Sequence, residues 1–169
     1  MPMKNLFKPD EIIDRYNLFD ADKYLKMGYD TILCDIDNTI DVPDSRKRGS
    51  DEAFAFLDML IARGYRVILF SNNTKDRVES FIGDKNYEYN CWSFKPLPFS
   101  YYKMMKKYNI KASQMISLGD QMLTDLIGAN LAGLYTVYTK QLVEKDSITT
   151  KINRKIERWI FKHVLHEEM

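Results

Sequence analysis

Four short groups of polar residues along the chain each follow an apolar run that is typical of a buried strand. The side chains in these groups that are suited to chemistry are Asp35, Asp37, Thr39, Ser71, Asn72, Lys95, Asp120 and Asp125. Aspartate carboxylates are hard oxygen ligands that suit Mg²⁺. The hydroxyl of Ser71 and the cation of Lys95 suit phosphate oxygens. The combination predicts phosphoryl transfer, in which the protein must offset the repulsion between an anionic nucleophile and an anionic ester.

Each signal is weak when it is taken alone. Ser71 followed by two asparagines would more often be a turn, and a single lysine or aspartate would more often be a solvated surface charge. A calcium loop starting at Asp35 is disfavoured, because an EF-hand needs Gly at its sixth position and Glu at its twelfth, where this chain has Ile40 and Arg46. A Ser-His-Asp arrangement stays open, with His163 and His166 in the tail. Only the joint placement of these groups after strands favours one site.

The elements that must position these groups alternate between strand and helix patterns. Strands are predicted at 31–36, 65–70, 89–92, 115–118 and 134–138, and helices at 10–24, 50–63, 74–82, 98–108 and 123–131. This alternation predicts βαβ units and a mostly parallel sheet. Ligands bind at the carboxyl ends of the strands in such a sheet, so the polar groups should converge on one edge.

Composition and charge set outer bounds on the function. The chain has 169 residues, of which 45% are hydrophobic, so one α/β domain with a real core is expected. A net charge of +1 predicts no nucleic-acid partner. Cys34 and Cys91 form no CxxC pair, which favours a reducing compartment. Neither a secretory signal nor an apolar run of about 18 residues is found, so we expect a cytoplasmic protein that can touch a membrane surface without crossing it.

The four polar groups resemble the four motifs of the haloacid dehalogenase superfamily. The residues that carry the resemblance are DIDNT at 35–39, Ser71, Lys95 and GDQMLTD at 119–125, within a region of about 29 to 140. A closer resemblance, to the cap-poor YqeG branch, covers nearly the whole chain through KPLP at 95–98, GDQMLTDLIGAN at 119–130, GLYTV at 133–137 and TKINRKIER at 150–158. That branch is related to phosphatidylglycerophosphate phosphatases.

The resemblance implies a Rossmann-like three-layer α/β sandwich with a parallel sheet of about five strands in the order 3-2-1-4-5 and no large cap domain. It implies that Asp35 is the nucleophile and that Asp37 is the general acid and base. It further implies that Mg²⁺ is held by Asp35, the carbonyl of Asp37 and Asp120. The remaining implied roles are to hold the phosphoryl group, for Ser71, Asn72 and Lys95, and to support the site, for Thr39 and Asp125.

The implied reaction is hydrolysis of a phosphate monoester through an aspartyl phosphate, with phosphatidylglycerophosphate at the inner membrane surface as the preferred substrate. A soluble sugar phosphate or nucleotide is the first alternative, and a phosphate-sensing or protein-binding module without turnover is the second.

The chain is expected to divide into an N-terminal helical segment at 1–28, a catalytic core at 29–140 and a basic amphipathic tail at 141–169. In the tail, one helical face would carry Ile152, Ile156, Trp159, Ile160 and Val164. Such a helix suits an anionic membrane surface, but it equally suits packing on the domain or on a second subunit.

Overall fold

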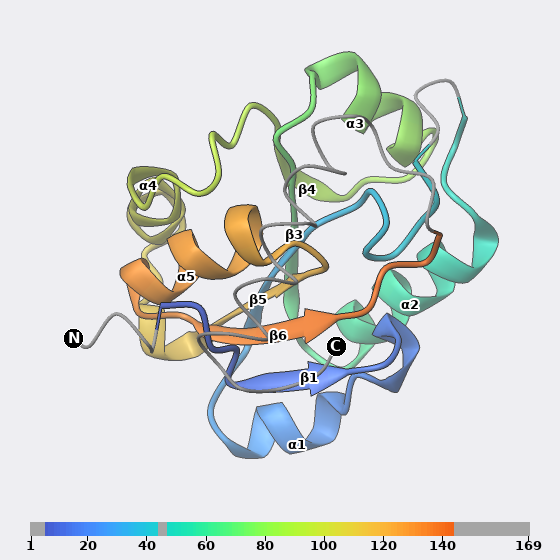
Figure 1. Cartoon of the computed structure of the whole chain (residues 1–169). Coiled ribbons are helices and arrows are strands. Elements are labelled where there is room, and N and C mark those ends of the chain that lie inside the picture. The colour runs from blue at the N-terminus through green and yellow to red at the C-terminus, as the bar shows by residue number, and fades with distance from the viewer. Residues whose placement is uncertain (1–5, 44–46, 144–169) are drawn as a thin grey trace.

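A six-stranded sheet forms the centre of the computed structural model, which describes residues 6–43 and 47–143. Its strands lie in the order β1-β6-β5-β2-β3-β4, and every described pair is parallel (Figure 1). They are β1 (Glu11–Ile13), β2 (Thr31–Cys34), β3 (Arg66–Phe70), β4 (Glu88–Asn90), β5 (Met115–Gly119) and β6 (Tyr135–Thr139). The predicted α/β class is confirmed, and the five predicted strands keep their predicted order.

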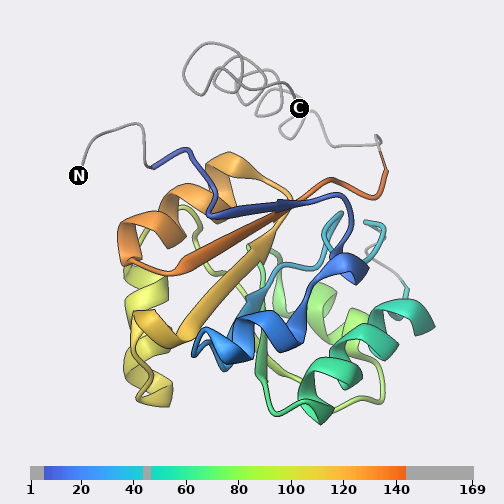
Figure 2. The same cartoon turned by 90° about the horizontal axis from the view of Figure 1, so that it is seen from below.

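Helices cover both faces of the sheet, which makes three layers (Figure 2). The short α1 (Ala21–Lys26), α2 (Asp51–Ala62) and α3 (Lys75–Ile82) lie on one face, and α4 (Phe99–Tyr108) and α5 (Ile127–Ala132) lie on the other. The starts of α2 and α3 follow from capping, because Ser50 Oγ accepts a hydrogen bond from Ala53 N and Thr74 Oγ1 accepts one from Arg77 N.

The central strands are apolar on both faces, because each face is covered by helices. Along β2, Ile32 and Cys34 pack against the first helical layer, whereas Leu33 packs against Tyr101 and Met104 of α4. This double burial explains why the strands appear in the sequence as continuous apolar runs rather than as alternating patterns.

The predicted helix at 10–24 is wrong in its first half. Glu11–Ile13 forms β1, a sixth strand that pairs with Val137–Thr139 of β6 at the edge of the sheet. Asp10 strengthens this edge, because its carboxylate accepts a hydrogen bond from Thr136 N at 2.8 Å. The sequence of Glu11–Ile13 fits a helix as well as a strand. These residues form a strand because the edge of β6 was free to pair with them. The segment at 1–28 is therefore not wholly helical, and the division of the chain into three segments stays a prediction.

A second departure concerns the predicted helix at 123–131. A single π-helical turn, Met122–Leu126, precedes the shorter α5. Of the amphipathic tail predicted at 141–169, residues 144–169 lie outside the described residues. Among the described residues, no helix is long and apolar enough to span a membrane.

Candidate active site

The parallel register brings the four polar groups to one end of the sheet. Cys34, the last residue of β2, pairs with Leu69 of β3 and with Leu118 of β5. The residues that follow these three positions therefore leave the sheet side by side. Asp35 is fixed at this point, because its backbone N–H donates to the carbonyl of Leu118 at 3.0 Å.

Lys95 lies between two carboxylates. Its Nζ is 2.7 Å from Asp35 Oδ1 and 2.6 Å from Asp125 Oδ1. Burial by itself would lower the pKa of Lys95, but the negative charges of Asp125 and Asp35 outweigh burial and raise this pKa. Lys95 therefore stays an ammonium ion, and its positive charge is fixed beside the carboxylate of Asp35.

The second oxygen of Asp35 is bound by Thr39. The hydroxyl of Thr39 lies 3.1 Å from Asp35 Oδ2 and 3.0 Å from Asp120 Oδ1. Thr39 is fully buried, so it links the loop after β2 to the loop after β5 inside the protein. A threonine four residues after Asp35 can therefore contact both carboxylates at once, while its role in support of the site stays a prediction.

The carboxylates of Asp35, Asp120 and Asp125 form a cluster that suits a hard divalent cation. One oxygen from each lies within 4.8 Å of the others. Lys95 pairs with Asp35 and Asp125 and brings one positive charge to the three carboxylates, so a divalent cation would balance the remaining negative charge. The donor set therefore fits Mg²⁺ in chemistry and charge, and it includes Asp125 as well as the predicted Asp35 and Asp120.

Asp125 also closes the loop that follows β5. Its Oδ2 accepts a hydrogen bond from Gln121 N at 3.0 Å, and its own N–H donates to the carbonyl of Gln121 at 2.8 Å. The carboxylate packs so tightly on Gly119 that a Cβ there would lie 2.4 Å from it. Glycine is therefore required at position 119, because any side chain would displace Asp125 from Lys95.

Ser71 and Asn72 hold the loop that carries Lys95. The side-chain amide of Asn72 donates to the carbonyl of Lys95 at 3.0 Å and accepts from its N–H at 2.7 Å. The carbonyl of Ser71 accepts from Ser93 N, and its hydroxyl accepts from Asn73 N. The side chain of Asn72 thus has a clear positioning contact, whereas its predicted role in holding phosphate stays a prediction.

Asp37 has a separate set of partners that the sequence analysis missed. Arg77 Nη2 and Asn73 Nδ2 each lie 2.5 Å from a different oxygen of its carboxylate. Burial raises the pKa of Asp37, and the charge of Arg77 opposes that rise. Arg77 is itself buried, and its Nη1 has no hydrogen-bond partner among the described residues. The available signal was the helix start that follows β3, since Asn73 directly precedes the Thr74 cap and Arg77 lies in the first turn of α3.

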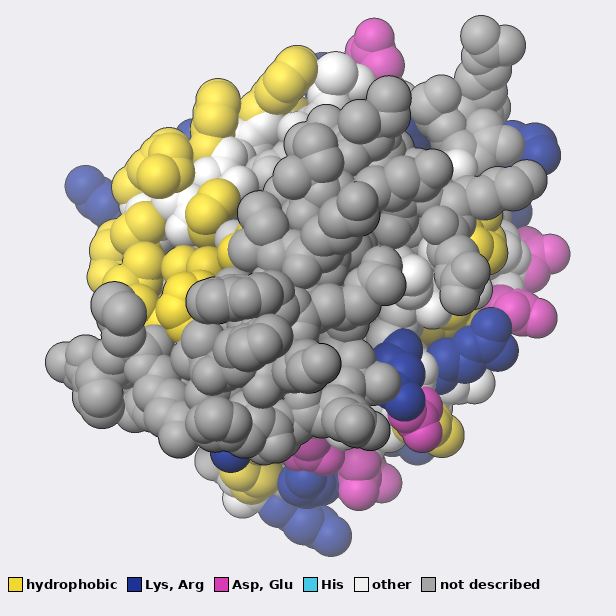
Figure 3. Space-filling view, viewed as in Figure 1, with side chains coloured by type: hydrophobic (Ala, Val, Ile, Leu, Met, Phe, Trp, Pro, Cys, Tyr) yellow, Lys and Arg dark blue, Asp and Glu magenta, His cyan; other side chains and the backbone are white. Residues whose placement is uncertain are grey.

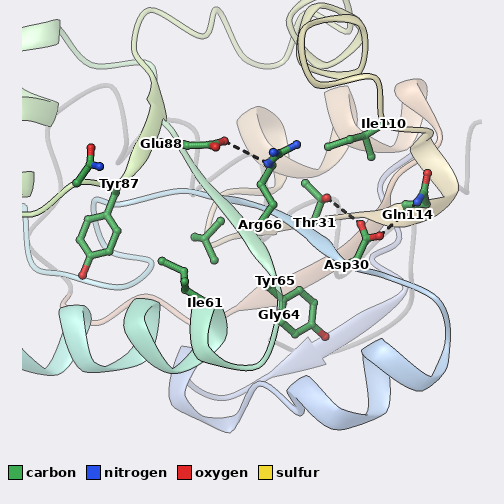
Figure 4. A pocket seen from close by; sticks show the side chains of 12 residues that line it. Asp30, Thr31, Ile61, Gly64, Tyr65, Arg66, Tyr87, Glu88, Ile110 and Gln114 are labelled. Atoms are coloured by element: carbon green, nitrogen blue, oxygen red, sulfur yellow. Dashed lines mark hydrogen bonds and ion pairs between the residues drawn. The ribbon is translucent and has the colours of Figure 1, made fainter.

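A groove of about 540 Å³ lies at the opposite end of the sheet (Figure 4). It is lined by Asp30, Thr31, Ile61, Gly64, Tyr65, Arg66, Val67, Asn86, Tyr87, Glu88, Ile110 and Gln114. None of the predicted site residues lines it. Its charged side chains form local pairs, such as Arg66 with Glu88 at 3.5 Å.

Comparison with known proteins points in the same direction as this geometry. The family described as HAD-hydrolase-like matches residues 94–165. The Bacillus subtilis protein named "Probable phosphatase YqeG" is 26% identical over 158 residues, which cover 94% of this chain and 91% of that protein.

Two solved structures share the fold. The cobalt-bound deoxy-D-mannose-octulosonate 8-phosphate phosphatase YrbI of Haemophilus influenzae is 13% identical, with a TM-score of 0.54 and coverage of 80% of this chain and 89% of that one. An uncharacterized protein of Listeria monocytogenes serotype 4b is 14% identical, with a TM-score of 0.55 and coverage of 72% and 87%. At these identities the structural likeness shows the fold alone. The matched family model and the Bacillus subtilis relative make this chain similar to haloacid dehalogenase-like hydrolases, and the residues gathered at the carboxyl end of the sheet agree with that similarity.

Proposed function

We propose that this haloacid dehalogenase-type phosphatase hydrolyses a phosphate monoester through an aspartyl phosphate on Asp35. The observation that carries the proposal is the ion pair between Lys95 Nζ and Asp35 Oδ1, which lie 2.7 Å apart. Asp120 and Asp125 lie close to this pair at the same end of the sheet. A carboxylate held by a buried cation is oriented for attack.

In the first step, an oxygen of Asp35 attacks phosphorus, and the bond between phosphorus and the ester oxygen breaks. Asp37 gives its proton to that leaving oxygen, so an alcohol departs. In the second step, Asp37 takes a proton from water as the water attacks phosphorus, and the acyl phosphate bond breaks to release inorganic phosphate. Arg77 and Asn73 hold the carboxylate of Asp37 during both transfers.

We further propose that Asp35, Asp120 and the carbonyl of Asp37 hold Mg²⁺, with Asp125 beside it. The bound ion would offset the negative charge of the phosphoryl oxygens. Lys95 adds a second positive charge to the site, and Ser71 and Asn72 fix the backbone that carries it.

Phosphatidylglycerophosphate is the substrate that we propose, met at the inner surface of the cytoplasmic membrane. The resemblance to the YqeG branch supports it. So does the shortness of residues 36–49, between Asp35 and the cap of α2, which leaves no room for a domain that would enclose a small substrate.

The test is phosphate release, with Mg²⁺, from detergent-dispersed phosphatidylglycerophosphate and from a panel of soluble sugar phosphates and nucleotides. We expect the highest kcat/KM on the lipid. Higher values on a soluble ester would replace the lipid by that substrate class, and no turnover on any ester would favour a phosphate-sensing or protein-binding module.

A further inference from the structure

The loop between β4 and α4, with the first turn of α4, presents a group of large apolar side chains to solvent. We call it the aromatic lip: Trp92, Phe94, Leu97, Phe99 and Tyr102, each of which is at least half exposed. The rings of Phe94 and Phe99 lie 6.2 Å apart. Figure 3 shows hydrophobic side chains gathered over this part of the molecule, at the upper left. A patch of several large apolar side chains marks an interaction surface more often than isolated exposed residues do.

The lip is exposed because the same loop must bury its alternate residues in the active site. Ser93 and Lys95 point inward, where Ser93 Oγ donates to the carbonyl of Asn90 and Lys95 pairs with Asp35. Trp92 and Phe94 point outward, and both have positive φ angles, which large side chains rarely adopt. Turning these rings inward would withdraw Lys95 from Asp35, so the lip is fixed beside the mouth of the site.

The charge of this region suits a negatively charged surface. Residues 89–119 contain no aspartate or glutamate. Four lysines after the lip are exposed: Lys103, Lys106, Lys107 and Lys111. On α4, Lys103 lies one turn beyond Phe99, and Lys106 lies one turn beyond Tyr102. Apolar side chains and lysines are therefore combined on one exposed side of the helix.

From this we infer that the aromatic lip docks on the surface of an anionic lipid bilayer. Tryptophan and tyrosine favour the boundary between head groups and acyl chains, and lysines add attraction to anionic lipids. Since the loop that carries the lip also carries Lys95, docking would turn the active site toward the head groups. The inference deepens the proposed function. It rests on that function only for the statement that the active site hydrolyses its substrate at the bilayer surface.

Trp92 itself reports whether the lip inserts. In full-length protein with Trp159→Phe, Trp92 is the remaining tryptophan. We expect its emission to shift to shorter wavelength on vesicles of phosphatidylcholine with phosphatidylglycerol, and brominated acyl chains to quench it. Sedimentation of the protein with the vesicles while Trp92 stays unquenched would overturn the inference, because another segment would then carry the binding.

A lip variant and a matched control separate the effect of the patch from a general loss of apolar surface. Phe94→Ser with Phe99→Ser should weaken vesicle binding by about tenfold, because two side chains leave the interface. Leu18→Ser with Ile61→Ser removes two exposed apolar side chains outside the lip and should leave vesicle binding unchanged. Equal weakening by both pairs, or unchanged binding in the lip variant, would count against the lip.

Measurements of activity and of molecular mass test whether the lip instead binds the substrate or a second copy of the chain. We expect the lip variant to keep its turnover of 4-nitrophenyl phosphate and to lose turnover of phosphatidylglycerophosphate in vesicles. A loss of both would assign the lip to a substrate pocket, and a change from dimer to monomer would assign it to self-association; either result overturns the inference. If the unaltered protein hydrolyses no ester, the proposed function fails, but quenching of Trp92 still decides whether the lip docks on lipid.

Discussion

The two ends of the parallel sheet both carry ion pairs, but they place them in different surroundings. At the carboxyl end, the side chains of Lys95 and Asp125 are each 4% exposed. At the amino end, those of Arg66 and Glu88 are each 43% exposed, and both side chains line the groove described above (Figure 4). Water screens the second pair and barely reaches the first. Charges held together out of water at the carboxyl end therefore favour a functional site there.

The largest effect on this contrast should come from Asp35→Asn. We expect turnover to fall by about 10⁴-fold or more, because the amide cannot form the acyl phosphate. The amide keeps the size of the carboxylate and can still accept a hydrogen bond from Lys95, so circular dichroism should show an intact fold. Turnover near that of the unaltered enzyme, in a preparation free of other phosphatases, would reject the covalent mechanism.

Removal of the metal should come next. With chelator, we expect turnover to fall by at least about 10³-fold, since a bound cation contributes several kcal/mol to stabilising the transition state. Added Mg²⁺ should restore turnover and should also raise the melting temperature, because it binds only the folded carboxylate cluster. Asp120→Ala should reduce both responses, and full activity in excess chelator would contradict the metal site.

Lys95→Met tests the buried charges through stability. We expect the free energy of unfolding to fall by about 3–5 kcal/mol, as is found when one partner of a buried ion pair is removed. Urea denaturation measures the change. Asp125→Asn added to Lys95→Met should recover part of this loss, because it removes a buried charge left without its partner, yet it should not recover turnover. An unchanged stability in Lys95→Met would show that water reaches this cluster.

A smaller effect is expected at Arg77, which contacts Asp37. Arg77→Gln should lower kcat by about 10- to 100-fold, because Arg77 positions Asp37, the proposed general acid and base, and such a group typically contributes about 10²–10⁴-fold in rate. Lys75→Gln is the control, since Lys75 lies on the same helix and pairs with Glu79 at the surface. Equal loss in both variants would point to damage to α3 rather than to the position of Asp37.

The smallest effect is expected at the amino end of the sheet. Arg66→Gln with Glu88→Gln should change the free energy of unfolding by less than about 0.5 kcal/mol, because an exposed pair contributes little. Turnover should not change. A large fall in turnover would mean that the groove takes part in function and that the contrast between the two ends is false.

The sequence alone predicted the residues that the sheet brings together. Asp35, Lys95, Asp120 and Asp125 were found because each follows an apolar run, and parallel strands align their carboxyl ends whatever the details of packing. The order of the five predicted strands, which the family resemblance implied, was also correct. Local patterns identify the strands themselves, because apolar runs and the turn residues that bound them occur within short stretches of sequence.

Only the tertiary structure decided the contacts between groups far apart in the sequence. Glu11–Ile13 formed a strand because the edge of β6 was free to pair with it, and the local sequence pattern does not indicate that such an edge is available. Arg77 pairs with Asp37 across forty residues, and the amide of Asn72 binds the backbone of Lys95. Each of these contacts depends on how helices and loops pack around the sheet, since the side chains meet only after the chain has folded.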